Sequence, residues 1–311
     1  MGSRKTKTVK PQIETKQNRP MITKKNLIWL APLALALGSC ALQAHDHLAA
    51  GAVSSAIGSQ LDFQNDGDFG GDSGFVFNLT AGTDTDPYNG YYYTDDLVFV
   101  ALAVTPDNGG PEPGAAGLGA HIQAQLLSIE GPAGASFGFW ETAQDGVDST
   151  NLTWSVPVPY ANGTNLIFVS ENEGSALADP YGHLHGRVYS FTKPGLYKAT
   201  WRFVDTSTNG PSGAPVNSPS APFYLYYQAD LTVGKITVAT NGVQLSFAAA
   251  SNVPDDNPEA PPTNYTLESS PTIGVDAVWT AVGDPVAGDD HLHTVVAPLA
   301  GSKVFFRLRA K

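Results

Sequence analysis

The sequence predicts an all-β protein: a larger β-sandwich followed by a small fibronectin-like or immunoglobulin-like β-sandwich. The chain of 311 residues holds 32 Gly and 23 Pro, whereas charged residues make up only 15%. This composition is typical of a turn-rich β-protein. Short apolar or alternating stretches recur between turn residues, as expected for strands. Outside the N-terminal leader, we find no long window with the 3.6-residue apolar spacing of an amphipathic helix.

Residues 1–44 are predicted to be a targeting segment rather than part of the fold. Basic residues precede the apolar stretch 27–37, which is too short for a confident membrane span. Cleavage after Ala44 would release a chain that begins at His45. A competing lipobox-like stretch, 37–40, would instead lipidate Cys40. In both cases we expect an exported protein, periplasmic, secreted or at the cell surface, with no transmembrane span in the mature chain.

The mature chain is expected to lack thiols and to be strongly acidic. Cys40 is the only cysteine, so disulfides, thiolate zinc sites and cysteine nucleophiles are excluded after cleavage. Loss of the leader removes eight of the 17 Lys and Arg and one of the 29 Asp and Glu, which leaves 9 against 28 and a net charge of −19. Such a chain does not bind nucleic acid or anionic lipid through general electrostatics, and it concentrates cations near its surface.

The first domain, residues 45–230, is expected to contain a series of short strands. After His45 the chain leads into residues 48–63. The further strands are expected over 74–79, 91–93 continued by 97–102, 121–130, 139–141, 152–158, 166–169 and 223–227.

The most informative stretch of this domain is 182–203, which is predicted to be a β-hairpin. Lys193-Pro194-Gly195-Leu196 has Pro and Gly where a type II turn favours them. The return strand alternates Tyr197, Ala199, Trp201 and Phe203 with polar residues, which predicts one buried face. His183 and His185 lie at the mouth of the hairpin, and on an extended chain residues two apart point the same way.

The second domain, residues 231–311, is expected to be the smaller sandwich, because short strands recur in it at regular spacing. Its strands are predicted over 235–240, 242–247, 265–269, 278–282, 291–296 and 304–308.

Three other patterns are given structural interpretations. The acidic stretch 65–68 lacks the spacing of an EF-hand, so we expect a solvated turn and calcium is unlikely as a ligand. Residues 134–138 match the G-x-S-x-G pattern, but no helix is expected after Ser136, so we do not expect a nucleophile. Tyr91, Tyr92 and Tyr93 can form a sugar-stacking platform, although strand filling is the favoured interpretation.

The histidines are clustered. Six of the seven form His-x-His pairs, 45/47, 183/185 and 291/293, and only His121 is single. Two pairs from one domain can converge into a set of imidazoles that suits Zn²⁺ or Cu²⁺. The alternative is that each histidine hydrogen-bonds its own loop, and this is what we expect for His291 and His293. The candidate ligands are His45, His47, His183 and His185, with His121 or Asp46 as further candidates.

Three segments carry a resemblance to a known family. These are residues 45–51, residues 125–140, and His183-x-His185 followed by Phe191-Thr192-Lys193-Pro194-Gly195-Leu196-Tyr197. Together they resemble the bacterial surface-anchored repeat family, also called the choice-of-anchor M or actinobacterial cell-wall repeat domain. The resemblance implies an exported β-sandwich often encoded near metal-type ABC transporters. The family commonly has another histidine where this chain has residues 92–96. The second domain resembles C-terminal modules of planctomycete and verrucomicrobial exported proteins.

These observations predict an exported, non-enzymatic protein that binds Zn or Cu through paired His-x-His motifs. The expected partners are the metal ion and a metal transporter or envelope component. One alternative is a structural surface module that binds glycans or proteins through its Tyr- and Trp-bearing strands. Another is a copper-dependent oxidase, in which the free α-amine and imidazole of His45 would form a copper brace with a second histidine.

Overall fold

The computed structural model describes residues 46–65, 75–85, 87–95, 97–105, 114–141, 152–230, 234–240, 242–249, 263–289, 291–298 and 303–311. The leader, His45 and most of the acidic stretch 65–68 lie outside these residues. Within them the protein is all-β, as predicted, with one 3-10 turn at Pro211–Gly213 (η3). No helix in this part of the chain has the length and apolar character needed to cross a membrane.

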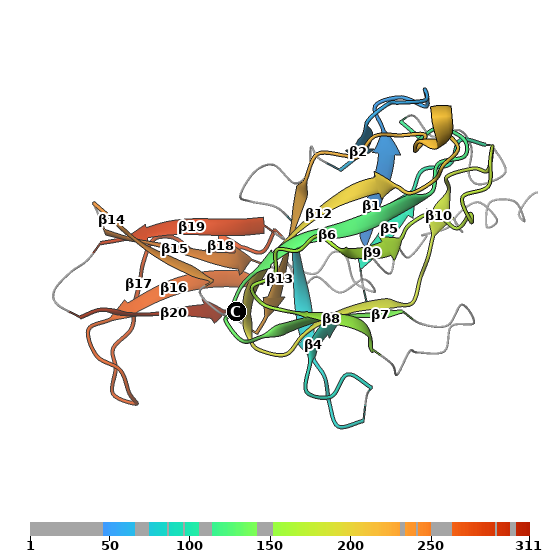
Figure 1. Ribbon diagram of the computed structural model, residues 1–311. Helices are drawn as coiled ribbons and strands as arrows, with labels where there is room; N and C mark the ends of the chain where they lie inside the picture. Colours follow the sequence, from blue (N-terminus) through green and yellow to red (C-terminus); the bar gives the residue numbers. More distant parts are fainter. Residues whose placement is uncertain are drawn as a thin grey trace, which may run out of the picture. The chain divides into compact units, whose positions relative to one another are not determined.

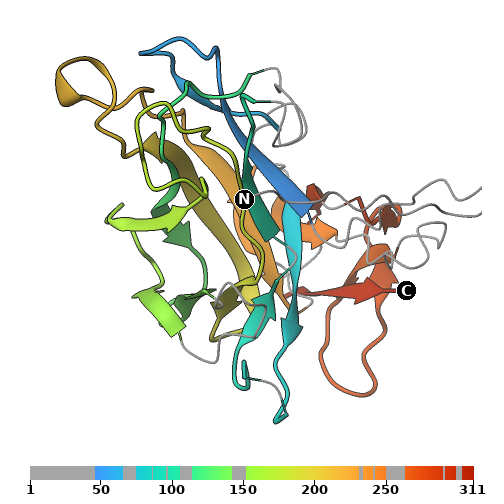
Figure 2. The same cartoon turned by 90° about the vertical axis from the view of Figure 1, so that its right-hand side faces the viewer.

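The larger sheet of the first domain has nine strands and is curled (Figures 1 and 2). Strand β3 pairs with β13 in parallel and with β4 antiparallel, and so joins its two halves. In sheet order the strands are β8 (Leu152–Pro157), β7 (Ser136–Glu141), β11 (Arg187–Phe191), β4 (Tyr92–Thr94), β3 (Val76–Ala81), β13 (Phe223–Ala229), β12 (Gly195–Asp205), β6 (Ile122–Glu130) and β9 (Asn165–Phe168).

A second sheet of four strands covers the core. Its order is β10 (Gly182–His183), β5 (Leu97–Ala101), β1 (Asp46–Ala52) and β2 (Leu61–Phe63). Strand β1 is parallel to β5, and β10 is antiparallel to β5 on its other side. Figures 1 and 2 show β1 in blue. Because neighbouring residues of a strand point to opposite faces, one face of this sheet packs inward and the other remains outside.

The core between the two sheets is rich in aromatic side chains. Residues of β12 alternate between buried and half-buried, and Tyr197, Trp201 and Phe203 are fully buried as predicted. Phe99 from the four-stranded sheet contacts Trp201 edge to face, with ring centroids 5.5 Å apart. Phe63 stacks on Phe223 at 4.1 Å. Each such ring contributes about 1.5–3 kcal/mol by leaving water, so the core fixes the position of the overlying sheet.

The predicted hairpin over 182–203 is wrong. Strand β11 pairs with β4 and β7, whereas β12 pairs with β13 and β6. The Pro-Gly stretch therefore passes between two separate parts of the curled sheet. All five residues of β11 are buried, so this strand needs cover on both faces, which a two-stranded hairpin cannot give. Phe191 and Tyr197, on either side of the connection, stack at 3.8 Å.

A second expectation is also corrected. Residues 91–93 and 97–102 were expected to make one strand, but they form β4 and β5, which belong to different sheets. The chain changes layer after Thr94. The alternation of core-facing and outward-facing residues in β5 therefore does not continue that of β4. The place of β5 in the second sheet decides which of its residues face the core.

The C-terminal residues form two further sheets. One contains β14 (Lys235–Ala239), β15 (Gly242–Ala249) and β19 (His291–Ala297) in that order. In the other, β16 (Asn264–Ser270) pairs with β17 (Thr280–Ala281), β18 (Val286–Ala287) and β20 (Phe305–Ala310). These strands share no sheet with β1–β13, although all described residues belong to one compact unit. The expected domain boundary near residue 230 stays a prediction.

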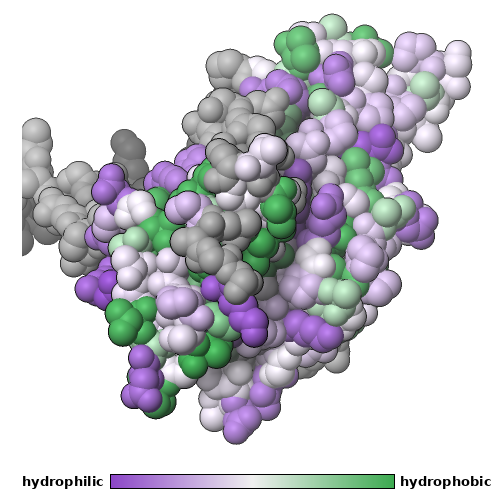
Figure 3. All heavy atoms as spheres, turned by 90° about the vertical axis from the view of Figure 1, so that its left-hand side faces the viewer, coloured by the Kyte–Doolittle hydropathy of each residue, from purple (hydrophilic) through white to green (hydrophobic). Residues whose placement is uncertain are grey.

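Exposed apolar side chains occur on the C-terminal strands. Ile236 and Val238 of β14 are exposed, and so is Val296 of β19. In the space-filling view, hydrophobic and hydrophilic residues are interspersed in small groups over the coloured part of the visible face (Figure 3).

A candidate metal centre

The outer face of the four-stranded sheet brings two sequence-distant histidines together. His47 of β1 pairs with Val98 of β5, and His183 of β10 pairs with Val100 of β5. Val98 and Val100 are two residues apart, so they point to the same face, and residues opposite them share that face. Leu48 and Phe99, one position along, point into the core and are buried. His47 and His183 therefore lean toward each other across β5, outside the core.

The two imidazoles meet through their Nε2 atoms, which are 2.9 Å apart. The rings are nearly perpendicular, at 86°, with centroids 4.6 Å apart. The ring of His185 lies against that of His183, with centroids 4.3 Å apart. Three of the predicted ligands thus form one cluster, which we call the His47–His183–His185 cluster.

The distance between the two Nε2 atoms is close to that between ligands of a metal site, although the cluster does not yet have the arrangement of such a site. Ligand nitrogens about 2.0–2.1 Å from a tetrahedral Zn²⁺ lie about 3.3 Å from each other. The two Nε2 atoms at 2.9 Å need to separate only slightly to reach that distance. In the described part of the chain, however, no three His, Cys, Asp or Glu side chains already surround a common position for an ion.

Close packing holds β10 in place beneath His183. A Cβ on Gly182 would lie 1.8 Å from the carbonyl oxygen of Val169, so no other residue fits there without displacing backbone. The backbone N–H of His183 donates to Glu171 Oε1 at 2.9 Å. The sequence gives no sign of Glu171, because its role depends on a loop that folds back on β10. Its carboxylate adds negative charge next to the cluster.

The other side of the cluster is held by a buried cation. Arg187 begins β11 two residues after His185, and its side chain is only 3% exposed. Its guanidinium donates to Glu141 Oε1 at 2.7 Å and to the carbonyl oxygen of Phe168. His185 itself is exposed and lies between β10 and β11 rather than on a strand. His183 and Arg187 thus fix the ends of this short segment, and the exposed ring of His185 lies between them.

The electrostatics favour neutral imidazole, the form that binds metals. Burial lowers the pKa of His47 below its ordinary value, and the nearby charge of His185 lowers it further. When both rings are neutral, one Nε2–H donates to the other Nε2 across the 2.9 Å contact. Both Nε2 atoms can bind a metal ion once that proton has moved to Nδ1 of its own ring, because metal and proton compete for the same lone pairs.

His121, a further candidate ligand, lies elsewhere. Its ring stacks on Phe168 with centroids 5.5 Å apart and an interplanar angle of 8°. Its backbone N–H donates to the buried carboxylate of Asp205 at 2.9 Å. The structure therefore does not bring His121 into the cluster. His45 and the side chain of Asp46 lie outside what the structure describes, and with them the copper brace.

Two of the three patterns given structural interpretations lie within the described residues, namely Ser136 and the tyrosines 91–93. Ser136 begins strand β7, and its backbone N–H donates to Thr192 Oγ1, so the strand–turn–helix context of a nucleophile is missing. The rings of Tyr91 and Tyr93 contact Trp140 and Tyr88, which makes an aromatic cluster at the edge of β4.

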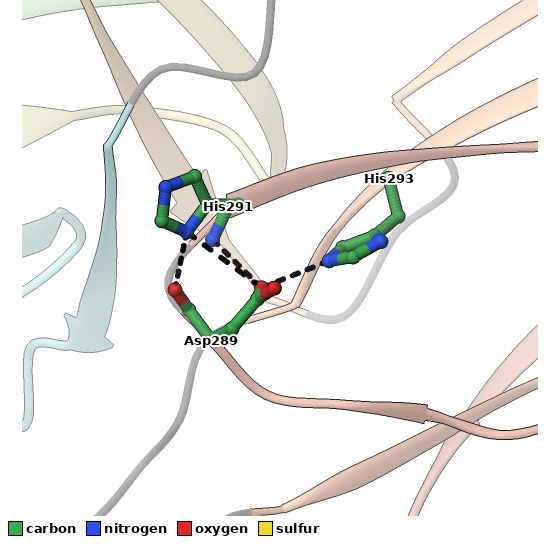
Figure 4. A network of polar contacts seen from close by, with 3 residues as sticks. All are labelled: Asp289, His291 and His293. Atoms are coloured by element: carbon green, nitrogen blue, oxygen red, sulfur yellow. Dashed lines mark hydrogen bonds and ion pairs between the residues drawn. The ribbon is translucent and has the colours of Figure 1, made fainter. Parts of the chain in front are cut away.

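The third His-x-His pair lies on β19 of the C-terminal sheets. His291 and His293 both approach the carboxylate of Asp289, which the sequence places two residues before the pair (Figure 4). We expected each of these two histidines to hydrogen-bond its own loop, and the structure adds that both approach one carboxylate.

Comparison of the chain with protein-family models, with curated proteins and with solved structures gives no match. The resemblance to surface-anchored repeats therefore stays a hypothesis, and the function is argued from the geometry of the clustered histidines.

Proposed function

We propose that this protein is an exported, non-enzymatic metal-binding protein whose His47–His183–His185 cluster binds Zn²⁺ or Cu²⁺. The observation that carries the proposal is the 2.9 Å contact between His47 Nε2 and His183 Nε2, which are 136 residues apart in the chain. Scattered surface histidines have no reason to converge from two strands on opposite sides of a third. The ring of the third imidazole, His185, lies beside that of His183, with centroids 4.3 Å apart.

The ligand type supports the choice of metal. Imidazole nitrogen suits Zn²⁺ and Cu²⁺, whereas Ca²⁺ and Mg²⁺ require oxygen ligands. The negative charge of the chain attracts cations, and Glu171 lies beside the cluster. Three imidazoles on an outer sheet face hold an ion where solvent and a partner can reach it. That exposure suits capture or transfer of the ion, which agrees with a metal transporter or envelope component as the partner.

Metal titration of the untagged mature chain tests the proposal. Bound metal is first removed with a chelator, and Zn²⁺ or Cu²⁺ is then added. We expect His183→Ala and His47→Ala each to bind one equivalent of metal less than the wild type. Loss of one ligand is expected to weaken binding by about tenfold or more, since even indirect partners of a ligand are worth that much. His121→Ala is the matched control, because it removes a histidine of the same domain outside the cluster.

The outcome that contradicts the proposal is equally direct. If the affinity and the amount of bound metal are the same for wild type, His47→Ala and His183→Ala, the cluster is not a metal site. Thermal unfolding of each variant without metal separates loss of the ligand from loss of the fold.

A further inference from the structure

The C-terminal strand β19 begins with a second group of metal-ligating side chains. His291 and His293 alternate along the strand, and Asp289 precedes them at the same two-residue spacing. In the register of β15 and β19, His293 is opposite Phe247 and His291 is opposite Ala249. Both partners on β15 are fully buried. The two histidines therefore occupy the sheet face that packs on the core of these strands, although their own side chains remain 38% and 29% exposed.

Polar groups on such a face require partners, because burial of an unpaired imidazole or carboxylate is costly. Here they partner one another. His293 Nε2 lies 2.8 Å from Asp289 Oδ1, and His291 Nδ1 lies 3.9 Å from the same oxygen (Figure 4). His291 Nδ1 also contacts the backbone carbonyl oxygen of Asp289 at 2.5 Å. The ring of His293 lies over that of Phe247 with centroids 6.2 Å apart. The carboxylate is thus the meeting point of both rings.

We propose that Asp289, His291 and His293 form a second site for a divalent transition metal, with Zn²⁺ as the reference ion. Two imidazoles and one carboxylate are a ligand set that first-row transition metals use with positions left open for water. The two separations from Asp289 Oδ1, 2.8 and 3.9 Å, lie on either side of the spacing of about 3.3 Å between ligand atoms of a tetrahedral ion. The group is closed by hydrogen bonds, so binding through these nitrogens opens the contacts of His293 Nε2 with Asp289 Oδ1 and of His291 Nδ1 with the Asp289 carbonyl oxygen, while the ring protons move to the other nitrogen of each imidazole.

This site differs from the His47–His183–His185 cluster in the chemistry it offers. A carboxylate in the ligand set adds a full negative charge, and the exposed side of the group leaves room for water ligands. We therefore expect a hydrated ion here rather than one held by imidazoles alone. The two sites lie on different sheets and share no residue, so each can be removed while the other is kept.

The experiment uses the mature chain carrying His47→Ala and His183→Ala, which removes the first cluster. Isothermal titration with Zn²⁺ is expected to show one remaining equivalent, and Co²⁺ is expected to give visible d–d absorption with the same stoichiometry. Adding Asp289→Asn keeps the size and one acceptor of the side chain but removes the charge. It is expected to weaken Zn²⁺ binding by about tenfold or more. The matched control is Asp284→Asn, which makes the same change of charge at an exposed position of the same sheets.

Each result decides the question. The site is supported if one equivalent of Zn²⁺ remains and Asp289→Asn weakens its binding, whereas Asp284→Asn does not. No remaining equivalent, or equal effects of the two Asn substitutions, overturns it. A further variant, His293→Gln, is expected to abolish the Co²⁺ absorption, and unchanged absorption would also overturn it. A failure of the proposed function at the first cluster gives a different result. In that case the wild type and the His47→Ala/His183→Ala parent bind the same amount of metal.

Discussion

The ion pair between Arg187 and Glu141 allows a prediction whose size follows from the structure. The guanidinium is 3% exposed, while the carboxylate is 38% exposed, so the pair lies between a buried and a surface ion pair. Breaking a fully buried pair costs about 3–5 kcal/mol. Exposed pairs are worth about 0.2–1 kcal/mol. Arg187 also keeps its hydrogen bond to the Phe168 carbonyl oxygen when Glu141 is removed. We therefore expect Glu141→Ala to lower the free energy of unfolding by about 2 kcal/mol.

A second substitution separates charge from hydrogen bonding. Glu141→Gln keeps an oxygen acceptor 2.7 Å from Arg187 Nη2, so we expect a loss of about 1 kcal/mol. Urea unfolding followed by circular dichroism measures both values, with Glu130→Ala as the control. Glu130 is exposed at the end of β6, and its removal is expected to cost less than about 0.5 kcal/mol. If Glu141→Ala is no more costly than Glu130→Ala, the guanidinium is solvated in the folded protein and the reasoning is refuted.

Three further predictions concern the same domain. Tyr189→Phe should leave stability unchanged or raise it by up to about 1 kcal/mol in thermal unfolding, because the fully buried Tyr189 hydroxyl has no hydrogen-bond partner among the described residues; a clear loss would imply a buried water. Gly182→Ala should remove the Zn²⁺ equivalent of the His47–His183–His185 cluster from the isothermal titration and lower the melting temperature, since its Cβ would clash with the Val169 carbonyl oxygen; a wild-type number of equivalents would contradict this. Burial lowers the pKa of His121, an effect that the Asp205 carboxylate opposes. The folded pKa of His121 is therefore below the unfolded value of about 6.5. The neutral imidazole contributes stability that is present above pH 6.5 and is lost as the pH falls through the folded pKa. His121→Gln should therefore reduce the slope of stability against pH on the acid side, and an unchanged slope would count against it.

Local patterns in the sequence predict the strands well, and the reason is physical. The alternation of Tyr197, Trp201 and Phe203 with polar residues can be satisfied only by one buried face, and β12 has that face. The expected loop around Lys193-Pro194-Gly195 is also present between β11 and β12. The pattern does not show which strands pair with each other. A Pro-Gly turn can join two neighbouring strands or two separate parts of one curled sheet, so the hairpin prediction failed.

The candidate site, like the fold, could be predicted from the sequence only in part. The His-x-His spacing identifies His47, His183 and His185 as possible ligands from composition and period alone. Their convergence depends on β5, which lies between β1 and β10 and is itself separated from β4 by a change of layer. No short-range signal in residues 91–102 predicts that change. Arg187 and Glu171 were missed for the same reason, since their partners are distant in sequence.

The central position of β5 also has a consequence for when metal is acquired. The two imidazoles that meet at 2.9 Å are separated by 136 residues, and the chain between them includes most strands of the domain. Closing so long a loop costs entropy that only the completed core repays. A nascent or unfolded chain therefore offers isolated His-x-His pairs with weak affinity. The assembled cluster exists only after folding, so if it binds metal as proposed, an exported chain would take the ion from the compartment in which folding is completed.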